Sequence, residues 1–157
     1  MKLSVASIGE VSDTAVANKV GYRLPWPAPG SASINTNYRN HGTGQMDFGI
    51  GSGMVVAAKA GTVVYLNDKH TQRRCDSTFG PRYNNVVVIK HGGDEYTLYL
   101  HLATGSIPSR IKDAFKEKGS ATVNRGDIIG RQGNIGYTWQ HRNPSPPIYC
   151  RELVHFK

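Results

Sequence analysis

Histidine and aspartate side chains near predicted turns are the residues of this sequence best suited to metal chemistry. The chain has six histidines, at positions 41, 70, 91, 101, 141 and 155. Asp47 follows His41 within the glycine-rich run 41–49, where glycine lets the backbone curve so that two side chains converge. Imidazole and carboxylate groups are standard zinc ligands, and a catalytic zinc site keeps one position for water. A hydrogen-bonded turn is the alternative interpretation of the His41–Asp47 pair.

Short apolar runs separated by turn residues predict the strands that would position these side chains. Residues 54–66 predict two strands that meet at Ala60-Gly61, where small residues interrupt the valine-rich runs. Residues 85–91 predict a further strand, and the alternation of polar and apolar residues over 95–102 predicts its hairpin partner. The Gly-Gly-Asp sequence between them is typical of a tight hairpin turn.

The rest of the chain adds strands, loops and little helix. Residues 107–118 are the only stretch with apolar side chains at helical spacing, so they predict one short helix. Residues 123–132 and 153–156 return to strand character, whereas 31–40 and 67–83 are polar and predict loops. The sequence therefore predicts an all-β fold class: an antiparallel β-sheet domain with one short helix.

Prolines mark the start of the predicted domain. Pro25, Pro27 and Pro29 favour an extended entry segment, which we expect to pack Trp26 against the domain edge. Residues 1–23 show no clear periodicity, and no linker or tandem repeat divides the sequence after them. We therefore predict an N-terminal arm over residues 1–23 and a single domain over residues 24–157.

Length and charge indicate a basic globular protein. The chain has 157 residues, enough for one domain with a sizeable core, and its formal net charge is +8. Such a surface attracts polyanions, among which anionic cell-wall polymers and lipid headgroups are candidates. The Lys and Arg residues are scattered rather than clustered, so no nucleic-acid partner is expected. A basic enzyme without a charged partner is the alternative.

Cysteine content and hydropathy bear on the compartment. Cys75 and Cys150 can form one disulfide in an exported protein or stay as two thiols, and both interpretations remain open. No stretch approaches the roughly 20 apolar residues of a membrane helix, so no transmembrane segment is expected. Glu10 and Asp13 interrupt any apolar core near the N-terminus, which therefore does not resemble a secretion signal.

Five motifs in the same order resemble those of the lysostaphin/LytM-type zinc endopeptidases. Each motif alone is modest, but their order strengthens the resemblance, which extends from about residue 24 to the end of the sequence. The motifs are His41…Asp47-Phe48-Gly49, the strand pair within 55–64, the hairpin formed by 85–92 and 96–102, the glycine-rich turns within 123–136, and Val154-His155-Phe156.

The resemblance implies a lysostaphin-like antiparallel sheet of the duplicated-hybrid-motif type that binds one Zn2+ ion. By position, His41 and Asp47 match the family's first two zinc ligands, and His155 matches the third. His101 matches a histidine that lies beside the ligands and helps to activate the metal-bound water. In such a site zinc lowers the pKa of its water and polarises the scissile carbonyl, while the imidazole takes the proton.

The function implied is that of a zinc-dependent endopeptidase that cleaves peptide cross-links of bacterial peptidoglycan. Its partners would be peptidoglycan peptides, with anionic wall polymers as further candidates, and its location would be extracellular or in the cell envelope. Carrier domains of the biotinyl/lipoyl and sugar-phosphotransferase type offer a hypothesis from another class, because residues 126–130 resemble their turn. That hypothesis does not predict the combination of His41, Asp47 and His155.

One departure from the family pattern supports an alternative function. Leu153 stands where the family has the first histidine of its closing pair, a catalytic partner of the position that His101 matches. Loss of such a group costs about 10²–10⁴ in rate. The chain is then a catalytically impaired relative that binds zinc or the cell wall, unless His141, from the loop before Leu153, compensates as a second catalytic residue.

Overall fold

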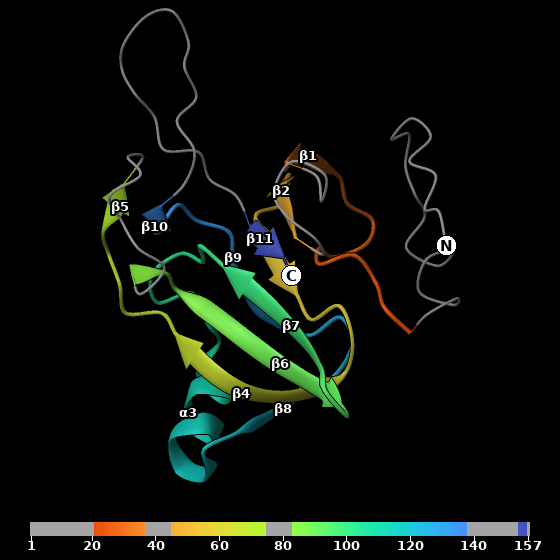
Figure 1. Ribbon diagram of the computed structural model, residues 1–157, viewed down its shortest axis with the longest axis vertical. Coiled ribbons are helices and arrows are strands. Elements are labelled where there is room, and N and C mark those ends of the chain that lie inside the picture. The colour runs from red at the N-terminus through yellow and green to blue at the C-terminus, as the bar shows by residue number, and fades with distance from the viewer. Residues whose placement is uncertain (1–20, 37–44, 75–82, 138–153, 157) are drawn as a thin grey trace, which may run out of the picture.

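The computed structural model describes residues 21–36, 45–74, 83–137 and 154–156, and its main feature is an antiparallel sheet (Figure 1). Seven strands form this sheet, and every neighbouring pair is antiparallel, so the predicted all-β class is confirmed. In sheet order the strands are β1 (Ala32–Thr36), β2 (Met46–Ile50), β11 (Val154–Phe156), β7 (Glu95–Leu100), β6 (Val86–Gly92), β4 (Gly61–Asn67) and β8 (Ala121–Val123).

Two smaller ladders and one helix accompany the main sheet in the described residues. Strand β3 (Met54–Val56) pairs antiparallel with β9 (Ile128–Arg131), and β5 (Arg73–Arg74) pairs parallel with β10 (Gly136–Tyr137). Helix α3 (Ser109–Lys118) lies within the segment that the helical spacing predicts.

The β6–β7 hairpin supplies the centre of the core. Val87, Ile89 and Tyr99 on one face of the hairpin are fully buried, whereas Tyr96 on the other face is 43% exposed. The buried face joins Ile111 of α3 in a single hydrophobic cluster. Burial of each large apolar side chain contributes about 1.5–3 kcal/mol. A one-residue slip would move this face to solvent, so burial fixes the register of the hairpin.

The proline-rich entry segment packs on the domain as expected. The Trp26 ring meets the Phe48 ring edge-on, with centroids 5.2 Å apart. Before it, the Arg23 N–H donates to the Ala58 carbonyl at 2.7 Å, and Tyr22 packs against the core cluster. Tyr22 and Arg23 belong to the predicted N-terminal arm, whose residues 1–20 lie outside the described residues.

Two strands occur where the polar sequence predicts loops, so these two loop predictions are wrong. In β1 the partly buried Ala32 and Ile34 flank the exposed Ser33, and this alternation places two apolar side chains against the core. Strand β5 interrupts the predicted loop 67–83 because β10, distant in sequence, pairs with it. Strand β7 ends at Leu100, two residues earlier than predicted.

Candidate active site

Strand β2 carries Asp47 on the face opposite the core residues Phe48 and Ile50, since neighbouring residues of a strand alternate between faces. Asp47 is nevertheless only 2% exposed, so its carboxylate is shielded from bulk water. A buried carboxylate is costly unless a cation or hydrogen-bond donors surround it. Asp47 is therefore chemically suited to the predicted role of metal ligand.

Strand β11 lies between β2 and β7 and determines the position of His155. In the ladder His155 is paired with Asp47 on one side and with Leu100 on the other. Directly opposed positions of antiparallel strands share one face of the sheet, with Cα atoms about 4.5–5.5 Å apart. The register therefore brings two of the predicted ligand positions together from remote parts of the chain.

The residue after Leu100 is His101, which leaves the strand in an uncommon conformation. Its φ is +64°, in the left-handed region that side chains other than glycine rarely adopt, at a cost of about 1–3 kcal/mol. The ring is buried, and its Nδ1 atom lies 2.8 Å from the Ile135 carbonyl oxygen. Because a carbonyl only accepts, Nδ1 carries the proton, and in the neutral ring Nε2 holds the lone pair.

The glycine-rich turn 133–136 packs tightly against His101 and its neighbours. A Cβ atom on Gly133 would lie 2.9 Å from the His101 carbonyl oxygen and 2.7 Å from the Ala103 nitrogen. Gly136 has a φ of +85°, and a Cβ atom there would collide with the Asn84 side chain. Both glycines therefore allow the close approach that sets the Ile135 carbonyl against the His101 ring.

Several predicted residues lie outside the described part of the chain: His41, His141, Leu153, Cys75 and Cys150. For His155 the structure gives the backbone register, so Asp47 is the predicted zinc ligand whose side chain is described. Among the described residues, no group of three or more His, Cys, Asp or Glu side chains could hold a metal ion.

Two further histidines form hydrogen bonds away from the predicted site. His91 Nδ1 lies 2.9 Å from the Ala60 carbonyl oxygen, and its Nε2 lies 2.8 Å from Thr97 Oγ1. His70 Nε2 lies 3.1 Å from the side-chain nitrogen of Asn67, which can only donate, so this ring nitrogen is the acceptor. The His91 ring therefore joins the hairpin to the turn before β4, and the His70 ring joins its loop to the end of β4.

Asn85 has a structural role that the sequence interpretation missed. It is fully buried directly before the apolar run of β6, and it hydrogen-bonds the segments on either side of the hairpin. The sequence contains one indication of this role: a polar residue stands directly before a fully apolar run.

The comparison with protein families decides the class of this chain. A model described as peptidase family M23 matches residues 41–145, more than half of the sequence. The chain belongs to peptidase family M23. The resemblance to the LytM/lysostaphin type is thereby confirmed, and the M23 match begins at His41 and includes Asp47 and His101. A search of curated proteins finds no match.

Membership of the M23 family identifies the general class as a β-rich hydrolase of the metallopeptidase type. It favours the peptidase hypothesis over a biotinyl/lipoyl or phosphotransferase carrier domain. The described part of the chain contains no helix long and apolar enough to cross a membrane.

The packing of Gly136 yields a first prediction. Gly119, which ends α3 with a φ of +70° and has nothing within 4 Å of its would-be Cβ, is the matched control. We expect Gly119→Ala to lower the free energy of unfolding by about 1–2 kcal/mol, the cost of a left-handed residue. Gly136→Ala should cost more because it also displaces Asn84. Denaturant unfolding measures both, and equal losses would show that the contact with Asn84 is unimportant.

Proposed function

We propose that the protein is a zinc-dependent endopeptidase that cleaves peptide cross-links of bacterial peptidoglycan. The observation that carries the proposal is the register of β11, which pairs His155 with Asp47 on one side and with Leu100 on the other. His101 follows Leu100 directly, so a buried carboxylate and two histidine positions come from β2, β11 and the turn directly after β7 in a chain of the M23 family.

The chemistry of these residues fits zinc. In the proposal His41, Asp47 and His155 hold the ion, a set of two imidazoles and one carboxylate that is common at catalytic zinc sites. Asp47 and His155 occupy opposed positions on rigid strands, which suits a site that must keep its geometry. When bound, zinc polarises the scissile carbonyl and makes a water molecule more acidic.

His101 is the proposed general base. Its Nε2 atom accepts the proton of the attacking water and later returns it to the leaving amine. The hydrogen bond from Nδ1 to the Ile135 carbonyl fixes the tautomer in which Nε2 can accept, and it stabilises the ring once that ring is protonated. The buried position of His101 keeps the imidazole in one orientation.

The substrate and location form part of the same proposal. Membership of a family whose members often act on peptidoglycan supports short wall peptides as the substrate. The net charge of +8 favours association with anionic wall polymers, because opposite charges attract over long range. We therefore propose that the protein acts in the cell envelope or outside the cell.

A second candidate function rests on Leu153. A leucine cannot exchange a proton or donate a hydrogen bond, so the partner that the family supplies to the His101 position is missing. The alternative is therefore a catalytically impaired relative that retains zinc or cell-wall binding, with His141 as the candidate that would restore activity.

The role of His101 is tested by replacing it with asparagine. Asparagine tolerates a left-handed backbone and can donate to the Ile135 carbonyl, but it cannot act as a base. We expect His101→Asn to lower the release of amino termini from purified cell walls by about 10²–10⁴-fold, while zinc stays bound. Wild-type activity should disappear with a chelator. Full activity of zinc-loaded His101→Asn would remove His101 from the mechanism.

The ligand role of His155 is tested by metal content. We expect His155→Ala to lower the zinc bound to the purified protein and to abolish the rise in Tm on adding zinc, because metal binding is coupled to the folded state. His91→Ala is the control, since His91 hydrogen-bonds Ala60 and Thr97 away from the proposed ligands. Unchanged zinc content in His155→Ala would exclude His155 as a ligand.

The alternative function is tested by restoring the missing histidine. We expect Leu153→His to raise the rate of wall digestion by up to about 10²-fold over an active wild-type protein, since it supplies a proton-carrying partner. His141→Ala should lower the wild-type rate and have less effect in the Leu153→His background. An inactive wild type together with an active Leu153→His variant would establish the impaired relative as correct.

A further inference from the structure

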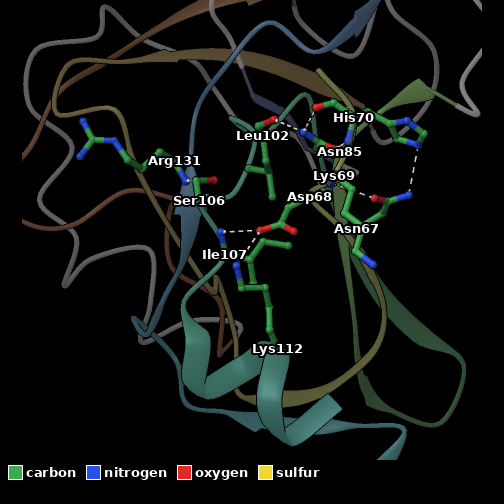
Figure 2. A network of polar contacts seen from close by, with 10 residues as sticks. All are labelled: Asn67, Asp68, Lys69, His70, Asn85, Leu102, Ser106, Ile107, Lys112 and Arg131. Atoms are coloured by element: carbon green, nitrogen blue, oxygen red, sulfur yellow. Dashed lines mark hydrogen bonds and ion pairs between the residues drawn. The ribbon is translucent and has the colours of Figure 1, made fainter. Parts of the chain in front are cut away.

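The six residues that follow His101 are held by hydrogen bonds along their whole length. These bonds come from three different parts of the chain, so the segment 102–107 has little freedom. They are Leu102 N to Asn85 O, Ala103 N to Arg131 O, Thr104 Oγ1 to His70 O, Gly105 N to Asp68 O, Arg131 N to Ser106 Oγ, and Ile107 N to Asp68 Oδ2. Figure 2 shows the bonds made by Leu102, Ser106 and Ile107.

Asn85 holds the end of this segment that adjoins His101. Its side-chain nitrogen donates to the Leu102 carbonyl at 3.1 Å, and its backbone carbonyl accepts the Leu102 N–H at 3.4 Å. The same amide bonds the His70 backbone twice, donating to the carbonyl and accepting the N–H, both at 2.9 Å. Asn85 is fully buried, so no water competes for these bonds.

We infer that Asn85 is a positioning residue that holds His101 in its left-handed conformation and so orients the His101 ring. Both backbone polar groups of Leu102 are bound to Asn85, which fixes the chain directly after His101. An uncommon backbone conformation persists only where surrounding structure over-determines it. The catalytic meaning of this role rests on the proposed function, whereas the effect on the ring does not.

The position requires a carboxamide. The side chain faces two carbonyl oxygens, of His70 and Leu102, and one N–H, of His70, so it must donate twice and accept once. An aspartate keeps the acceptor but turns a second oxygen toward the two carbonyls. Asn85→Asp therefore changes the hydrogen bonds and leaves the shape nearly unchanged.

The far end of the segment is held separately. Asp68, which is 5% exposed, accepts the Ile107 N–H at 3.2 Å and the Lys112 ammonium at 3.3 Å (Figure 2). These contacts join the segment to α3 rather than to His101. Because the two ends have different anchors, a change at Asn85 acts on His101 without releasing the helix.

The test compares Asn85→Asp with the control Asn67→Ala. Asn67 belongs to the same network and bonds the His70 ring and the Lys69 N–H, but none of its bonds reaches Leu102. Two-bond 1H–15N correlation spectra of the histidine rings report which nitrogen of His101 is protonated. Wall digestion gives kcat and KM. If Asn85→Asp does not fold, the smaller, uncharged Asn85→Ser takes its place in the same comparison.

We expect wild type and Asn67→Ala to show His101 protonated at Nδ1, and Asn85→Asp to lose this single pattern. For Asn85→Asp, kcat should fall by about 10²-fold with little change in KM, because the base is displaced. An unchanged His101 spectrum and a wild-type kcat in Asn85→Asp, with only a lower Tm, would overturn the inference.

The two proposals can fail separately. If the wild-type protein digests no wall peptide but Asn85→Asp still alters the His101 spectrum, the peptidase proposal fails and the positioning role stands. If the wild type is active and Asn85→Asp alters neither spectrum nor kcat, the positioning role fails and the peptidase proposal stands.

Discussion

The arrangement of the site depends on the pairing of β11 with two strands at once. Three residues, Val154–Phe156, connect β2 to β7, and through them the β1–β2 pair joins the remaining strands of the main sheet. A slip of one residue would transfer His155 to the other face of the sheet. Because β11 has a partner on each side, a slip would break the register with both. A short strand can therefore determine which positions of the sheet lie opposite each other.

Beside this ladder, hydrogen bonds and close packing hold His101 in a backbone conformation that is otherwise unfavourable. His101 adopts a positive φ directly after the strand, while Gly133 and Gly136 allow another turn to approach it. The buried hairpin core supplies the rigid base, and buried amide and carboxylate groups fix the adjoining segments. Apolar burial thus fixes the strands of the sheet, and hydrogen bonds fix the conformation of the segment that follows β7.

Much of the scaffold follows from local pattern, whereas the site does not. The valine-rich run and the alternation after it predict the β6–β7 hairpin, and the apolar spacing of 107–118 predicts α3. Strand β5 could not be predicted, since two residues show no periodicity and their partner is distant. The pairing of Asp47 with His155 depends on tertiary structure. Only the family resemblance put these two residues in one predicted ligand set. The turn at His101 could not be predicted, because the alternation of polar and apolar residues continues to Leu102.

The central position of β11 also has a consequence for the order of folding. Among the described strands of the main sheet, β1 and β2 are hydrogen-bonded to the others only through β11, which comes last of these strands in sequence. During synthesis the hairpin β6–β7 can form early from local contacts, but β2 lacks that neighbour until residues 154–156 leave the ribosome. Completion of the sheet and of the proposed ligand set is therefore a late event. During synthesis the chain therefore contains His41, Asp47 and His101 before His155, the last of the proposed ligands, has been added.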